Sequence, residues 1–149
     1  MKILLIEDGD YKIERVCEYI NSLNNSHSIT VCKSYSSALQ NIVQENFDLA
    51  IIDMSLPTFD KSPDEAGGEF RTYGGLDLAR QIKRRKINID FLYLSQYKTF
   101  SDSDSSLTIN DVNIQAENLC GPSYLGFIYY EHSGYDWKKT LGKTIKDYE

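Results

Sequence analysis

The sequence predicts an α/β fold in which a five-stranded parallel sheet is doubly wound, with helices on both faces. Short apolar runs alternate with segments of helical periodicity along the 149 residues. The apolar content of 41% is enough for one full core. Acids stand directly after two of the apolar runs. With right-handed crossovers between the strands, we expect a single domain over residues 1–149 whose strands follow 2-1-3-4-5, a common order in doubly wound sheets.

The elements follow from local patterns. Apolar and β-branched runs predict strands at 2–6, 28–32, 49–52, 89–94 and 125–130. Apolar residues three or four apart predict helices over 10–23, 34–43, 76–82, 109–119 and 137–148. Asp10 and Ser34 are suitable N-caps for the first two helices. The polar tract 101–106 precedes the fourth helix and is expected to be a loop.

The segment 58–75 interrupts the alternation of strands and helices that short connections join elsewhere. It is roughly three times longer than the 2 to 6 residues usual for such a connection. It contains Pro63 and four glycines, yet Phe59, Phe70 and Tyr73 can dock it onto the domain or onto a partner. We therefore expect an inserted loop between the third strand and the third helix, serving as a lid or as a partner surface.

Acidic side chains gather at the strand ends. Glu7 and Asp8 end the first strand and Asp53 ends the third, and these strands are neighbours in the expected order. Like charges this close disfavour one another unless a hard divalent cation neutralises them, and Mg2+ is the natural choice. With such a metal, Asp53 could act as a carboxylate nucleophile towards a phosphoryl group.

The composition excludes several classes of function. A net charge of −6 repels nucleic acid and anionic membranes, so neither is expected as a partner. No run approaches the length of a membrane span, and no signal peptide is recognisable, which favours a cytoplasmic protein. Three cysteines without paired spacing indicate neither disulfides nor a zinc site.

Taken together, the chain resembles a response-regulator receiver domain (CheY-like, with the flavodoxin-like sheet order) over nearly its whole length. The segments that carry the resemblance are 6–8, 53–57, 74–79, Ser95 and 126–128. The resemblance implies that Glu7 and Asp8 hold Mg2+ and that Asp53 accepts phosphate. It further implies that the Ser55 carbonyl completes the metal site. Ser95 would be the switch hydroxyl and Phe127 the switch aromatic that is coupled to it.

Two positions depart from the family pattern. Receivers end the fifth strand with a lysine, usually followed by proline, where this chain has Tyr130 and Glu131. Losing one preorganised donor typically costs about 3 kcal/mol in a transition state, so phosphorylation should be slower unless another cation substitutes. Lys98 and Arg71 are the candidates for that cation.

The second departure is Gln96, which follows the switch hydroxyl where the family usually has a small residue. A side chain of this length is expected to gate the pocket.

Two functions are compatible with these residues. The first is a stand-alone receiver-like signalling protein, without catalysis beyond self-phosphorylation, whose phosphorylation on Asp53 by a histidine kinase or small donor controls a protein contact. The alternative is a pseudo-receiver, a constitutive protein-binding module that acts through the 58–75 loop or the face of the last strand and helix. A homodimer is left open in both cases.

Overall fold

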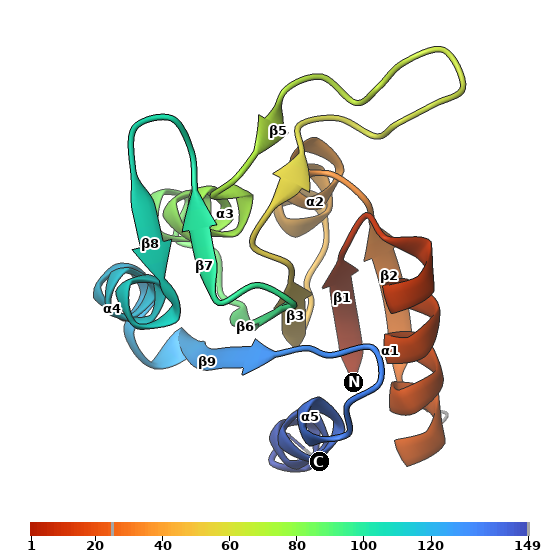
Figure 1. Cartoon of the computed structure of the whole chain (residues 1–149). Helices are drawn as coiled ribbons and strands as arrows, with labels where there is room; N and C mark the ends of the chain where they lie inside the picture. Colours follow the sequence, from red (N-terminus) through yellow and green to blue (C-terminus); the bar gives the residue numbers. More distant parts are fainter. Residues whose placement is uncertain (25, 149) are drawn as a thin grey trace.

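A computed structural model describes residues 1–24 and 26–148. Five parallel strands form the main sheet in the order β2-β1-β3-β6-β9, which confirms the predicted doubly wound fold and strand order (Figure 1). Glu149, at which the domain was expected to end, lies outside the described residues.

The strands of the main sheet are β1 (Lys2–Ile6), β2 (Ser28–Cys32), β3 (Leu49–Ile52), β6 (Asp90–Ser95) and β9 (Tyr124–Tyr129). The helices are α1 (Asp10–Leu23), α2 (Tyr35–Gln44), α3 (Gly74–Arg84), α4 (Ile109–Cys120) and α5 (Asp136–Lys146), with a 3-10 turn at Gly121–Ser123. Each helix found by periodicity is therefore present, including α4, whose apolar pattern is weak.

Alternate side chains of the strands build two cores. On one face of the sheet, Leu4 and Ile52 pack in a cluster with buried residues of α2, α3 and α4. On the other face, Leu5 and Ile51 pack with buried residues of α1 and α5. Helices thus cover both faces, as a parallel sheet requires.

The first helix starts one residue away from the predicted cap. Its N-cap is Gly9, and Asp10 is already the first helical residue. The Gly9 amide donates to Glu7 Oε1 at 3.0 Å, while the Asp10 carboxylate pairs with Lys33 at 2.7 Å. The capping expectation for Asp10 is therefore wrong, because a carboxylate from the preceding strand end accepts this amide. Ser34, in contrast, caps α2 in a reciprocal capping box with Ser37.

Helix α3 begins at Gly74, two residues before the predicted start. At Gly75 an added Cβ would lie 2.8 Å from the Tyr93 ring and 3.1 Å from the Met54 backbone. The Gly75 amide donates to the Met54 carbonyl at 2.7 Å. Glycine is thus required for the helix to start directly against the end of β3, where the acidic residues lie.

Two short hairpins were not predicted. Around the expected 58–75 insertion, β4 (Leu56–Pro57) pairs antiparallel with β5 (Phe70–Arg71), and the ladder continues as the Thr58 amide donates to the Glu69 carbonyl. We call residues 56–71 the inserted hairpin, which projects from the domain in Figure 1. Likewise β7 (Thr99–Ser101) pairs with β8 (Ser106–Thr108), so the segment expected to be a loop is partly a hairpin.

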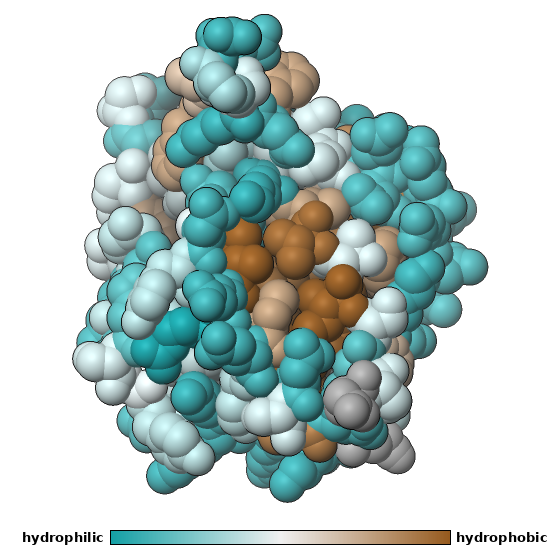
Figure 2. All heavy atoms as spheres, turned by 90° about the vertical axis from the view of Figure 1, so that its right-hand side faces the viewer, coloured by the Kyte–Doolittle hydropathy of each residue, from teal (hydrophilic) through white to brown (hydrophobic). Residues whose placement is uncertain are grey.

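The surface around the β2 edge carries an apolar patch. Val31, on this edge strand, is 37% exposed. Figure 2 shows apolar side chains gathered on this side of the molecule and surrounded by hydrophilic residues. In the described part of the chain, no helix combines the length and apolarity needed to cross a membrane.

The central strand β3 should dominate the stability of the fold. Ile51 is completely buried, so Ile51→Ala is expected to lower the free energy of unfolding by about 2–5 kcal/mol. Val43→Ala is the control, because Val43 is half exposed on α2 and its truncation should change stability by less than about 0.5 kcal/mol. Urea denaturation followed by circular dichroism measures both. Equal losses in the two variants would contradict the assigned core.

Candidate functional site

The parallel register brings the acids together. Ile6 pairs with Ile52, so the residues that follow these two strands emerge side by side at one edge of the sheet. One carboxylate oxygen each of Glu7, Asp8 and Asp53 lies within 4.8 Å of the others. We call these three residues the acid cluster. The clustering deduced from strand order is present, and its oxygen ligands suit a hard divalent cation.

The acid cluster is mostly shielded from solvent. Glu7 is 3% and Asp53 5% exposed, whereas Asp8 is half-buried. Burial is the main cause that raises the pKa of all three carboxyls. The neighbouring Asp53 carboxylate raises the pKa of Glu7 further, and Glu7 does the same to Asp8. The folded protein therefore holds these acids at an electrostatic cost.

A lysine that sequence reasoning missed enters this cluster from α1. Lys12 is 3% exposed, and its Nζ lies 2.5 Å from Glu7 Oε2 and 3.6 Å from Asp53 Oδ1. The same ammonium donates to the Leu94 carbonyl at 2.7 Å and contacts Gln96 Oε1 at 3.3 Å. This positive charge lowers the pKa of Glu7 and of Asp53 against the effect of burial.

A signal for Lys12 does exist in the sequence. The buried residues of α1 are Lys12, Val16 and Ile20, which are spaced four apart and share one face of the helix. A lysine in register with core residues is rarely buried unless an anionic partner receives it. Helical register, combined with the acids at the strand ends, could have identified this side chain.

The two residues at the end of β6 both face the cluster. Ser95 is fully buried, and its hydroxyl hydrogen bonds to Asp53, which lowers the pKa of that carboxyl. Ser95 is thus adjacent to the acid it was expected to serve. Gln96 covers Lys12 rather than Asp53 directly.

Ser55 and Met54 follow Asp53 and lead towards the inserted hairpin. The Ser55 hydroxyl donates to the Thr72 carbonyl at 2.8 Å, which fixes the turn after β3. The Met54 amide donates to Asp53 Oδ1 at 2.9 Å. This backbone donor orients the carboxylate and lowers its pKa.

Tyr130 and Phe127 lie at and near the end of β9. The buried Tyr130 ring lies under the Lys12 ammonium, 5.2 Å from its centroid, and the Tyr130 hydroxyl contacts His132 Nδ1 at 3.0 Å. Phe127 is half-buried and packs against Tyr93 and Phe100 at centroid distances of 6.3 and 6.0 Å. Phe127 therefore lies in the aromatic cluster that connects β9 to the β7–β8 hairpin.

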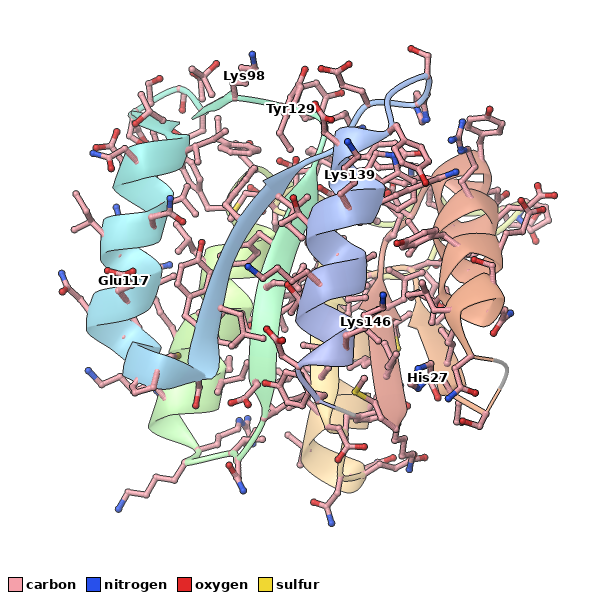
Figure 3. The ribbon with its side chains drawn as sticks, turned by 90° about the horizontal axis from the view of Figure 1, so that it is seen from below. His27, Lys98, Glu117, Tyr129, Lys139 and Lys146 are labelled. Carbon is pink, nitrogen blue, oxygen red and sulfur yellow. The ribbon has the colours of Figure 1, made fainter. Side chains whose placement is uncertain are left out.

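The two candidate cations proposed from the sequence lie elsewhere. Lys98 Nζ stacks on the Tyr129 ring at 4.8 Å, and Figure 3 shows both side chains together at one edge of the domain. Arg71 stacks on the Tyr35 ring at 4.0 Å and pairs with Asp77 at 3.3 Å. The expectation that Lys98 or Arg71 serves the pocket is wrong, because aromatic rings and another acid hold them away from it.

The inserted hairpin reaches the acid cluster. Lys61 Nζ lies 3.5 Å from Asp8 Oδ2, although the Lys61 side chain is 59% exposed. An ion pair this exposed contributes little stability. Nevertheless, it brings the hairpin to the mouth of the pocket.

One observation supports a cation at this site. Glu7 Oε2 is buried, and the Lys12 ammonium at 2.5 Å is its ion-pair partner. The three carboxylates offer oxygen ligands within 4.8 Å of one another, which is the kind of donor set that a hard divalent cation prefers. The residues present therefore fit Mg2+, with Glu7, Asp8 and Asp53 as the side chains that would hold it.

The raised pKa values predict how stability depends on pH. Because burial raises the pKa of Glu7 and Asp53 above their ordinary values of 4.5 and 3.8, the folded state binds protons that the unfolded chain has released. In the absence of metal, the free energy of unfolding should therefore fall as the pH rises from the ordinary pKa values of these carboxyls towards their raised values in the folded protein. Asp53→Asn removes one acid and should therefore unfold at a higher temperature than the wild type near neutral pH, with the difference shrinking at acidic pH.

Thermal denaturation in EDTA from about pH 4 to about pH 8 measures this effect. Asp104→Asn is the matched control, since Asp104 is exposed in the turn between β7 and β8, and it should follow the wild type. Parallel curves for Asp53→Asn and the wild type would contradict the electrostatic cost assigned to the cluster.

Comparisons with known proteins bear on the fold of the chain. No protein-family model matches the chain. A relative described as uncharacterized protein y4jR of Sinorhizobium fredii is 25% identical over 144 residues, covering 95% of this chain and 94% of that protein.

Solved structures match the fold at low identity. A receiver domain (CheY-like) from Methylobacillus flagellatus superposes with a TM-score of 0.59 at 20% identity, covering 100% of this chain and 98% of that one. The response regulator TrrA from Thermotoga maritima, solved in complex with Mg(2+)-BeF, superposes with a TM-score of 0.59 at 15% identity, covering 95% and 96%. The chain therefore has the fold of response-regulator receiver domains.

Proposed function

We propose that this chain is a receiver-type signalling protein in which Asp53 accepts a phosphoryl group. The single observation that carries the proposal is the convergence of Glu7, Asp8 and Asp53 at the carboxyl edge of a parallel sheet. The buried Ser95 hydroxyl beside Asp53 supports it. The Mg(2+)-BeF complex of TrrA, a protein of the same fold, shows that such a fold can take up a metal and a phosphoryl analogue.

The chemistry is a phosphoryl transfer to a carboxylate. An Asp53 oxygen attacks phosphorus, and the bond from phosphorus to the donor breaks, with the electron pair going to the leaving atom, which is an oxygen in acetyl phosphate and a ring nitrogen in a phosphohistidine. Bound Mg2+ would neutralise charge on the phosphoryl oxygens. The Met54 amide orients the Asp53 carboxylate, and the Ser95 hydroxyl can donate to the new group. A partner protein, a histidine kinase or an effector, would supply the phosphoryl group or read the product.

Incubation with Mg2+ and acetyl phosphate should give a single phosphoryl adduct on the wild-type chain. Asp53→Asn should give none, because the amide is not a nucleophile. Asp104→Asn should form the adduct at the wild-type rate. Intact-mass spectrometry, followed by peptide mapping, measures the modification. Absence of an adduct on the wild type under saturating donor, or an adduct on Asp53→Asn, would refute the proposal.

A constitutive protein-binding module is the second candidate, and the inserted hairpin favours it. Phe59 and Phe70 are each 56% exposed on this hairpin. Large apolar side chains exposed together on one element are typical of a protein-binding surface. In this case the low exposure of Asp53 would reflect a site that no longer exchanges phosphate. The hairpin would then bind its partner in every state of the acid cluster.

The double variant Phe59→Ser/Phe70→Ser separates the two functions. If the chain is a constitutive module, this variant should lose the partner that the immobilised wild type retains, while Asp53→Asn should retain it. Ile114→Ser is the matched control, since Ile114 is 50% exposed on α4. Pulldown from the source cells with quantitative mass spectrometry measures retention. Retention by the double variant, or loss by Asp53→Asn, would contradict the constitutive module.

A further inference from the structure

The end of β9 supplies no positive charge to the acid cluster. Tyr130 occupies the position where the family pattern has a lysine, and its hydroxyl contacts His132 rather than an acid. Its ring packs against Trp137 at a centroid distance of 5.0 Å. Unless another side chain supplies a cation, three carboxylates would face one another and an incoming anion without compensation.

Lys12 reaches the acid cluster from α1. Its ammonium contacts Glu7 at 2.5 Å and stands 3.6 Å from Asp53 Oδ1, the oxygen that also accepts from the Met54 amide. The Tyr130 ring lies beneath this ammonium at 5.2 Å. Aromatic faces attract cations, so the residue that replaced the strand-end lysine helps to hold a lysine from elsewhere.

The Lys12 side chain is fixed before any ligand arrives. It is 4% exposed, and the Leu94 carbonyl accepts from it at 2.7 Å beside the switch hydroxyl of Ser95. A charge held in place by buried partners needs little reorganisation when a new anion appears next to it. Lys61, a second lysine at the cluster, is 59% exposed and pairs with Asp8. Lys12 is thus a preorganised cation next to Asp53, whereas solvent screens the charge of Lys61.

From these contacts we infer that Lys12 is the charge partner of the phosphoryl group on Asp53, in place of the lysine that receiver domains carry after their last strand. This inference rests on the proposed function. In receiver domains this positive charge comes from the end of the last strand, whereas here it comes from α1. In both cases it lies next to the aspartate that accepts the phosphoryl group.

Three variants test the relocation. Lys12→Met removes the charge and keeps the length of the side chain. It should slow adduct formation from acetyl phosphate on the order of 100-fold, the usual effect of losing one preorganised donor. It should also bind Mg2+ about tenfold more tightly in titration calorimetry, because the metal no longer meets a fixed positive charge. The double variant Lys12→Met/Tyr130→Lys restores a cation from β9 and should recover at least about tenfold of the rate.

Lys61→Met is the matched control and should change neither quantity more than about twofold, since its charge is screened by solvent. A variant that merely misfolds would lose Mg2+ binding as well as phosphorylation, so opposite changes in the two readouts identify a charge effect. An adduct that forms on Lys12→Met at the wild-type rate would overturn the role of Lys12 but leave the proposed function intact. No adduct on the wild type would instead refute the proposed function. Failure of Tyr130→Lys to restore the rate in a double variant that binds Mg2+ would also overturn the relocation.

Discussion

Repulsion among three clustered carboxylates, two of them buried and one half-buried, is the constraint on which the arrangement of this edge of the sheet depends. Parallel pairing of β1 and β3 forces Glu7 and Asp53 together, and burial raises their pKa values. The fold tolerates this because Lys12 enters from α1 and backbone amides donate to both acids. The site is therefore an anionic cluster with one buried cation, an arrangement that is costly without metal and suited to a divalent metal.

Placing the cation on α1, at Lys12, and not at the end of β9, where Tyr130 stands, has a structural consequence. A lysine at the end of β9 would connect the acid cluster to the strand, whereas Lys12 connects it to α1 and, through the Leu94 carbonyl, to β6. Tyr130 also packs against Trp137 of α5. A new anion on Asp53 would therefore pull on a helix that packs beside α5, and displacements would spread to the α1–α5 layer as well as to Ser95.

The sequence allowed the strands, their order and the acid cluster to be predicted, because strand ends in a parallel sheet meet at one edge irrespective of distance along the chain. Lys98 and Arg71 were wrong candidates since proximity in sequence to Ser95 or the loop says nothing about which aromatic ring holds a side chain. To predict that Lys12 enters the acid cluster, one needs to know which face of α1 packs against the sheet. The β7–β8 hairpin was not predicted because each of its strands has only three residues, which is too short for the alternation of polar and apolar residues to be recognised.

Charge balance links the proposed role of Lys12 to the proposed binding of a metal. With all groups ionised, the three acids together with Lys12 and Lys61 leave the pocket with a single negative charge. Phosphorylation replaces the −1 of Asp53 by about −2, so without metal the deficit would double. A divalent cation brings the sum to zero. If Lys12 were removed, the phosphorylated, metal-bound pocket would again carry a net negative charge, at the least solvated point of the cluster.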